Sequence, residues 1–187
     1  MYIDITTKVT PGAMKDAQGN EVKALSGHLG THFDVMNKEF PLDNLKRTAV
    51  IFDVSQVSER DISINDINYE QLEGGVFVIF YTGFIEREGY GTERYFKLHP
   101  QLSDELIDIL LAKKVSMIGI DFAGVRRGSE HTPKDQYCAD RGVFIIENLC
   151  NLHHALCGEK QVVMTAYTFP VNYSDMTGLP CRVVLEV

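Results

Sequence analysis

The sequence has little of what marks secreted, membrane-spanning or disulfide-stabilised proteins. Its 187 residues include no tryptophan, six prolines and four cysteines. The cysteines form no Cys-x-x-Cys pair and no short disulfide framework, which favours reduced thiols packed as small apolar side chains. No stretch approaches the roughly 20 apolar residues of a membrane-spanning helix. These absences argue against an extracellular disulfide scaffold and against a membrane protein.

Positive charge is scarce as well. The 18 Lys and Arg residues are outnumbered by 26 Asp and Glu residues, which gives a formal net charge of −8. An acidic excess repels phosphate backbones, and no basic cluster is longer than the two residues of Arg126-Arg127, so we expect no binding to nucleic acid. The segment MYIDITTKVT has no basic region followed by an apolar run, so we expect a cytoplasmic protein.

What is present is enough apolar material for one domain spanning residues 1–187. Apolar residues make up 44% of the chain, and folding at this length removes roughly 70% of the unfolded surface from water. Alternating or continuous apolar runs predict strands. The predicted strands cover residues 2–6, 48–54, 76–81, 115–120, 142–146, 161–167 and 182–187. The pattern indicates a mixed α/β domain with more strand than helix.

One helix is predicted over residues 104–113, where apolar side chains recur at helical spacing. Ser103 stands at the N-cap position, acidic residues fill the first turn, and Lys113-Lys114 close the last turn. This charge order matches the helix dipole at both ends.

Three segments are predicted as loops. Pro11-Gly12 and the polar residues that follow are typical of a loop or hairpin, and residues 83–99 and 122–135 are long enough to be functional loops. The aromatic residues that flank the loop 83–99 are candidates for either the core or a pocket for a planar substrate: Tyr81, Phe84, Tyr90, Tyr95 and Phe96.

The strongest functional signal lies between His28 and Asp34. Two histidines, His28 and His32, and the carboxylate fall within seven residues, and imidazole with carboxylate suits Zn²⁺, Mn²⁺ or Fe²⁺. In a helix Asp34 would point away from the histidines, whereas in an extended chain all three side chains share one face. A straight strand would separate the two histidine Cα atoms by roughly 13 Å, and Gly30 permits the bend that aims both rings at one point. The alternative is a pair of partly exposed strand histidines beside a turn.

These residues resemble a family, the cyclase-like metal-dependent hydrolases that include bacterial kynurenine formamidase and isatin hydrolase. The family hallmark is His-x-Gly-Thr-His-x-Asp-x-Pro-x-His, and this chain supplies its first seven positions as His28-Leu-Gly-Thr-His-Phe-Asp34. The similarity extends over nearly the whole chain. Further matching segments are Ile3–Thr6, Thr82-Gly83, Val115–Asp121, Gly142–Leu149 and Gly178–Arg182.

The resemblance implies a swivelling β/β/α domain with a mixed sheet and few helices, usually assembled as a homodimer or homotetramer. It implies that His28, His32 and Asp34 ligate a divalent metal, Zn or Mn, with Glu147 as a further ligand and catalytic group. A carboxylate that ends a strand of apolar residues needs a cation or a donor when buried, although Glu147 could instead face solvent or pair with Arg182. The implied reaction is hydrolysis of an amide, formamide or lactam C–N bond in a small molecule.

Two positions depart from the family pattern. The hallmark places its presumed proton-transfer histidine at residue 38, where this chain has Lys38. Lys38 is therefore a candidate catalytic base if its pKa is depressed, and otherwise an ordinary surface lysine. The formamidases have a histidine twelve positions before the glutamate, and 147 − 12 = 135 is Asp135. Asp135 is a candidate metal ligand whose hard carboxylate favours manganese or magnesium over zinc.

Two further side chains have open roles. His131, four residues before Asp135, could replace the missing histidine ligand. Asp121, at the end of a predicted strand, could accept a hydrogen bond from a ligand imidazole or cap the loop that follows. Because the departures fall on the chemical part of the pattern, a second function stands beside the hydrolase: a catalytically impaired metal- or ligand-binding protein on the same scaffold.

Overall fold

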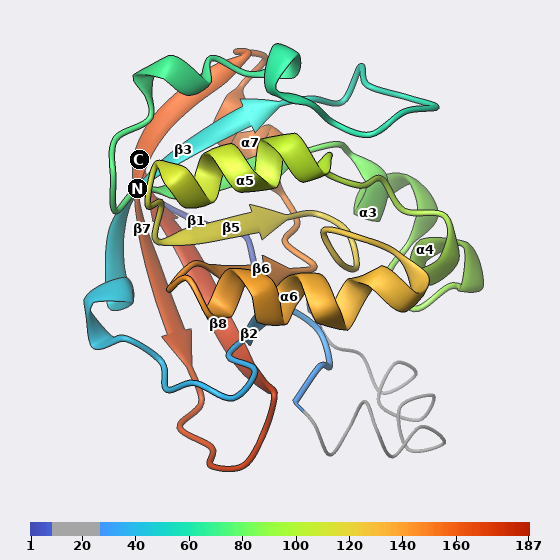
Figure 1. Ribbon diagram of the computed structural model, residues 1–187. Helices are drawn as coiled ribbons and strands as arrows, with labels where there is room; N and C mark the ends of the chain where they lie inside the picture. The colour runs from blue at the N-terminus through green and yellow to red at the C-terminus, as the bar shows by residue number, and fades with distance from the viewer. Residues whose placement is uncertain (9–26) are drawn as a thin grey trace.

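The computed structural model describes residues 1–8 and 27–187 (Figure 1). The predicted loop at Pro11-Gly12 lies outside the described residues. The strands are β1 (Tyr2–Asp4), β2 (His32–Asp34), β3 (Lys46–Asp53), β4 (Phe77–Tyr81), β5 (Met117–Ile120), β6 (Phe144–Glu147), β7 (Gln161–Pro170) and β8 (Gly178–Glu186). The helices are α3 (Phe84–Glu88), α4 (Glu93–Lys97), α5 (Asp104–Ala112), α6 (His131–Ala139) and α7 (Leu152–Leu156), with short 3-10 turns at Leu42–Leu45, Ile64–Asp66, Tyr69–Gln71 and Gly128–Glu130.

The strands form one mixed sheet that closes into a barrel. Its order is β1-β8-β2-β6-β5-β4-β3-β7, and a further pairing of β7 with β8 closes a ring that includes every one of these strands except β1. Strands β3, β4, β5 and β6 run parallel, whereas β2, β7 and β8 pair antiparallel with their neighbours. The parallel half therefore brings the carboxyl ends of four strands to one edge of the sheet.

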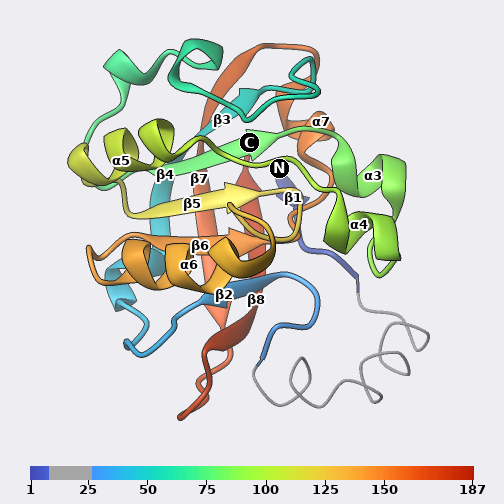
Figure 2. The ribbon, with the colours of Figure 1, turned by 45° about the vertical axis from the view of Figure 1, so that its right-hand side comes forward.

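Alternation along the strands divides the core into two layers. In β3, Ala49 and Ile51 belong to the cluster inside the barrel, which α7 also joins through Leu152. Val50 and Phe52 belong to the outer cluster, which includes buried residues of α5. Helices α5 and α6 cover the outer face of the parallel strands (Figures 1 and 2). Because successive strand residues face opposite sides, the layer that a residue joins identifies the face of the sheet that it occupies.

The expected α/β fold with a mixed sheet and few helices is confirmed. All seven predicted strands are present with shifted ends, and the predicted helix is α5, where the Ser103 hydroxyl accepts from Leu106 N–H at 3.1 Å. The segments 83–99 and 122–135 differ from the prediction, since the first contains α3 and α4 and the second contains the start of α6. Among the described residues, no helix has the length and apolar character needed to cross a membrane.

Candidate metal centre

Strand β2 directs two of the predicted ligands out of the barrel. Phe33 belongs to the inner core cluster, so its neighbours His32 and Asp34 point to the outer face, toward α6. Both side chains are only 1% exposed. The short strand therefore holds an imidazole and a carboxylate side by side beneath a helix.

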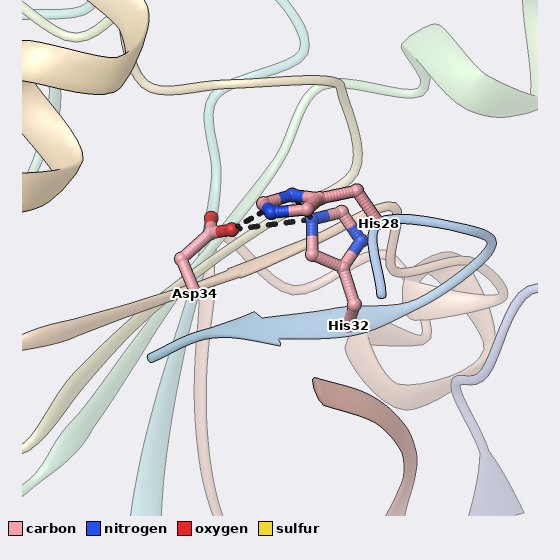
Figure 3. A group of neighbouring side chains, drawn as sticks. All are labelled: His28, His32 and Asp34. Carbon is pink, nitrogen blue, oxygen red and sulfur yellow. Dashed lines mark hydrogen bonds and ion pairs between the residues drawn. The ribbon is translucent and has the colours of Figure 1, made fainter. Parts of the chain in front are cut away.

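His28 reaches the same place from the bend that precedes β2. Gly30 has a φ of +71°, a conformation that glycine adopts without the steric penalty of other residues. His28 Nδ1 lies 3.0 Å from His32 Nε2 and 3.2 Å from Asp34 Oδ1, and His32 Nε2 lies 3.3 Å from Asp34 Oδ1 (Figure 3). The bent, partly extended segment does aim both rings at one point.

This triangle of atoms has the dimensions of a metal-binding face. Ligand atoms that bind one tetrahedral ion with bonds of about 2.0–2.1 Å lie about 3.3–3.4 Å apart. Both oxygens of Asp34 are buried; Oδ2 has no hydrogen-bond partner, and Oδ1 meets the two imidazoles at ion-pair distance. A buried carboxylate oxygen without a donor is costly unless it meets a cation. The residues present fit a divalent metal.

Glu147 joins the group through the register of the sheet. Strands β2 and β6 are antiparallel, and His32 stands directly opposite Glu147. Glu147 Oε2 lies 3.5 Å from His32 Nε2, while Oε1 lies 2.9 Å from His131 Nε2. Glu147 is buried and neither faces solvent nor pairs with Arg182, whose guanidinium pairs with Asp4. Its carboxylate therefore links two histidines from different elements.

A second cluster forms at the start of α6. His131 and Asp135 are four residues apart, so they lie on one face of the helix, and His131 Nε2 is 3.2 Å from Asp135 Oδ2. Together with Glu147 their ligand atoms lie within 4.8 Å of one another. Asp135 Oδ1 is buried without a hydrogen-bond partner. The structure thus brings together every predicted metal ligand, with His131 added beside Asp135.

The charges of the two clusters shift the pKa values of their members. Burial opposes the charged form of His32, but the Asp34 carboxylate raises its pKa to about 9. Burial likewise opposes the charged form of His131, yet the hydrogen bond to Glu147 raises its pKa to about 10. The His32 charge outweighs burial and lowers the pKa of Asp34, whereas burial and the negative charge of Asp34 raise the pKa of Asp135 well above its usual range. Imidazole protons balance the carboxylates where a cation would otherwise do so.

Lys38 lies elsewhere. Its ammonium forms an ion pair with Asp140 at 2.7 Å, and its side chain is 37% exposed. It lines a groove of about 490 Å³ whose apolar members include Phe40 and Leu179. None of the contacts found among the described residues joins Lys38 to either cluster, so its catalytic role stays a prediction without geometric support.

Asp121 supports the edge of the sheet near the clusters. It follows β5, and its carboxylate accepts hydrogen bonds from Thr82 N–H, the Thr82 hydroxyl and Gly83 N–H at 2.6–2.9 Å. Burial raises its pKa to about 7. These bonds tie the end of β5 to the end of β4. Two roles were considered for Asp121, a hydrogen bond to a ligand imidazole and a cap on the loop that follows it. The hydrogen bonds instead make Asp121 a cap on the turn after the neighbouring strand β4.

An aromatic group borders the site. The Tyr90 hydroxyl accepts the N–H of Gly30 at 2.7 Å. Tyr90, Tyr95 and Phe96 pack against one another with ring centroids 5.3–5.8 Å apart. Tyr95 is fully buried. The predicted loop 83–99 therefore supplies both core packing and a wall next to the histidine bend.

Comparisons with known proteins agree with this arrangement. The model of the family described as "Putative cyclase" matches residues 3–126. A solved structure titled as a potential metal-dependent hydrolase with cyclase activity is 22% identical, covers 99% of this chain and 96% of its own, and has a TM-score of 0.74. A predicted metal-dependent hydrolase from Bacillus stearothermophilus is 21% identical over 99% and 97% of the two chains, with a TM-score of 0.72. An isatin hydrolase bound to the product analogue thioisatinate is 19% identical over 86% and 72%, with a TM-score of 0.70. No curated protein matches the chain.

Proposed function

This chain belongs to the cyclase family, and we propose that it is a metal-dependent hydrolase that cleaves an amide, formamide or lactam C–N bond of a small molecule. The observation that carries the proposal is the convergence of His28 Nδ1, His32 Nε2 and Asp34 Oδ1 within 3.3 Å of one another, in a buried place where Asp34 Oδ2 has no hydrogen-bond partner. The names of the similar solved structures, two metal-dependent hydrolases and an isatin hydrolase, support the same reaction class.

The protein side of the chemistry follows from the site. A divalent ion held by His28, His32 and Asp34 would polarise the substrate carbonyl and lower the pKa of a bound water to about 7. The hydrogen bond from His32 Nδ1 to the carbonyl oxygen of Gly30, at 2.9 Å, keeps the proton on Nδ1 and leaves the Nε2 lone pair free for the ion.

Proton transfer is assigned to the pair formed by Glu147 and His131. Glu147 Oε2 lies 3.5 Å from His32 Nε2, one atom of the ligand triangle, so it could accept a proton from a water held beside the triangle. Glu147 Oε1 is bonded to His131 Nε2, and His131 retains 33% exposure. With a single ion at His28, His32 and Asp34 and none in the second cluster, this imidazole could deliver a proton to the departing nitrogen. The geometry favours this pair over Lys38.

The metal is proposed to be Zn²⁺ or Mn²⁺. Two imidazoles and one carboxylate accept either ion. The second cluster supplies one imidazole and two carboxylates, a harder donor set that suits Mn²⁺ better. Glu147 contacts a histidine of each cluster, with Oε2 3.5 Å from His32 Nε2 and Oε1 2.9 Å from His131 Nε2, so it would serve as a ligand for an ion in the second cluster and stay next to the first.

Metal analysis combined with a substrate panel tests the proposal. The purified chain, loaded in turn with Zn²⁺ and Mn²⁺, is assayed on isatin, N-formylkynurenine and simple formamides, and His28→Ala serves as the metal-ligand variant. We expect turnover of at least one C–N bond that a chelator abolishes and that the variant lacks. A metal-loaded protein that cleaves none of the panel would contradict the hydrolase assignment.

One observation favours a second candidate, a catalytically impaired metal- or ligand-binding protein. Lys38 occupies the position of the family's proton-transfer histidine and pairs with Asp140 on the surface. If Glu147 and His131 do not move the proton, the site would bind metal without turnover. Lys38→His distinguishes the candidates: a gain of activity from an inactive parent would show that only the base is missing. A cytoplasmic location and a homodimer or homotetramer stay predictions.

A further inference from the structure

The carbonyl oxygen of Gly30 is shared by two side chains in the wall of the metal centre. It accepts from His32 Nδ1 at 2.9 Å and from Asn148 Nδ2 at 2.9 Å. A carbonyl oxygen can only accept hydrogen bonds. Both nitrogens must therefore carry hydrogen toward it, which fixes the His32 tautomer and the orientation of the Asn148 amide together.

The orientation of Asn148 continues to a buried tyrosine. Because Nδ2 faces Gly30, Oδ1 faces the opposite way, and it accepts from the Tyr95 hydroxyl at 2.7 Å. Tyr95 comes from α4, Asn148 follows β6, and Gly30 precedes β2. Three segments far apart in the sequence thus form one chain of hydrogen bonds that ends on a ligand imidazole.

Every member of this chain is removed from water. Tyr95 is fully buried, His32 is 1% exposed and Asn148 is 2% exposed. No bulk water is available to replace a lost partner, so each donor or acceptor depends on its neighbour in the chain. Asn148 also adopts a φ of +60°, a conformation that asparagine tolerates better than most residues.

We propose that Tyr95 and Asn148 are positioning residues for the metal ligand His32, acting through the carbonyl of Gly30. The inference rests on the proposed metal-dependent function, and it assigns to the buried Tyr95 hydroxyl an effect on metal affinity. Tyr95 orients the Asn148 amide, Asn148 fixes the carbonyl of Gly30, and this carbonyl holds the His32 ring with Nε2 aimed at His28 Nδ1 and Asp34 Oδ1. Neither positioning residue belongs to either group of ligand atoms.

Tyr95→Phe is the first test because it removes one oxygen and leaves the ring packing in place. Changing an outer partner of a metal-bound histidine typically weakens metal binding about 10- to 100-fold. Since Tyr95 acts through Asn148, we expect about a 10-fold rise in the dissociation constant for Zn²⁺. Competition with a chromophoric chelator measures this constant without any substrate.

Tyr167→Phe is the matched control. Its hydroxyl also donates a short hydrogen bond, to Glu186 at 2.6 Å, but it lies on the β7–β8 ladder with partly exposed neighbours. We expect the control to leave the Zn²⁺ dissociation constant unchanged. An equal loss in both variants would overturn the inference, since it would reflect a general effect of losing a tyrosine hydroxyl.

Asn148→Asp is the second variant, and it gives the stronger effect. It keeps the shape and the acceptor, but it replaces the Nδ2 donor with a carboxylate oxygen that faces the carbonyl of Gly30. Two acceptors then face each other in a buried site, which costs more than the loss of one bond. We expect weaker Zn²⁺ binding than in Tyr95→Phe.

The visible absorption spectrum of the Co²⁺-loaded protein separates positioning from simple loss of stability. This spectrum responds to the geometry of the ligands, so a displaced His32 ring should change it in both variants. Thermal midpoints with chelator present are measured in parallel. Lower midpoints with an unchanged spectrum and an unchanged Zn²⁺ constant would show a purely structural role and overturn the inference.

The two hypotheses fail in different ways. A wild-type chain that binds no divalent metal overturns the proposed function, and the positioning role with it. If the wild-type chain, Tyr95→Phe and Asn148→Asp all bind Zn²⁺ equally tightly, only the positioning role is overturned. Hydrolysis of the substrate panel is scored separately and enters neither comparison.

Discussion

Gly178 lies against the imidazole of His28 with no room for a side chain. A Cβ atom at residue 178 would lie 2.9 Å from both Cδ2 and Nε2 of the His28 ring. Gly178 also stands opposite Asp34 in the pairing of β8 with β2. The first residue of a late strand therefore determines where an early ligand can sit, and the absence of a side chain there is part of the metal centre.

Gly178→Ala is therefore expected to weaken metal binding. Its backbone φ lies outside the left-handed region that favours glycine, so the backbone conformation accepts alanine. The added methyl would displace the His28 ring and press on the Gly27 carbonyl carbon, 3.1 Å away, just before this ligand. We expect about a 10-fold loss of Zn²⁺ affinity, as for other changes beside a ligand. Gly74→Ala is the control, because its Cβ would meet its nearest atom at an ordinary 3.4 Å. Equal affinities in the two variants would contradict the prediction.

Asp34 predicts how metal and stability are linked. Zn²⁺ at 100 times its dissociation constant should raise the free energy of unfolding of the wild-type protein by about 2.7 kcal/mol. Asp34→Asn preserves the shape but removes the carboxylate that faces two imidazoles, so the same Zn²⁺ concentration should stabilise it far less. Thermal or urea unfolding with and without Zn²⁺ measures both values. The same stabilisation in both proteins would show that the ion binds elsewhere.

Substitution of His131 tests how many metal ions one chain binds. The second cluster consists of His131, Asp135 and Glu147, and His131→Ala removes its only imidazole. We expect the Mn²⁺ stoichiometry of the wild-type chain to fall from two to one, with the site at His28 and His32 retained. His154→Ala, which changes an exposed histidine on α7, should leave the stoichiometry unchanged. Elemental analysis after gel filtration counts the ions.

The ligand group His28, His32 and Asp34 could be predicted from the sequence because its members fall within seven residues of one another. The alternation of side chains in an extended chain, with one bend at Gly30, was enough to predict that His28, His32 and Asp34 share a target. The fold class followed from the apolar runs and the family pattern. Closure of the barrel by β7 and β8 was not predicted, since a pairing between two late strands leaves no mark on either one alone.

The second cluster, His131, Asp135 and Glu147, depends on contacts between segments far apart in the sequence. Asp135 was predicted because the resemblance to the formamidases implies a ligand twelve positions before Glu147, but His131 stayed an open alternative because residues 122–135 were interpreted as a loop. The signal was the spacing of four residues, which puts both side chains on one helical face. The catalytic role of Lys38 stays a prediction, and its partner in the structure, Asp140, follows a helix that the sequence did not predict.

His99 predicts how stability depends on pH. It is 2% exposed, stacks on Phe122, and burial lowers its pKa from 6.5 to about 4. Glu147 nearby favours the charged ring, whereas His131 and Arg127 disfavour it. Between pH 6.5 and 4 the His99 imidazole is protonated in the unfolded chain but neutral in the folded chain. The folded state therefore loses stability as the pH falls through this range.

His99→Phe removes this proton uptake while keeping an aromatic ring on Phe122. From pH 7 to pH 5 the His99 contribution amounts to about 2 kcal/mol, at about 1.4 kcal/mol for each pH unit below 6.5. The free energy of unfolding of the metal-free wild type should therefore fall about 2 kcal/mol more than that of His99→Phe, whatever their difference at pH 7. Urea unfolding at both pH values measures the two changes, and His154→Ala is expected to follow the wild type. Parallel pH profiles for wild type and His99→Phe would show that the imidazole takes up its proton in the folded state, because both states would then titrate alike.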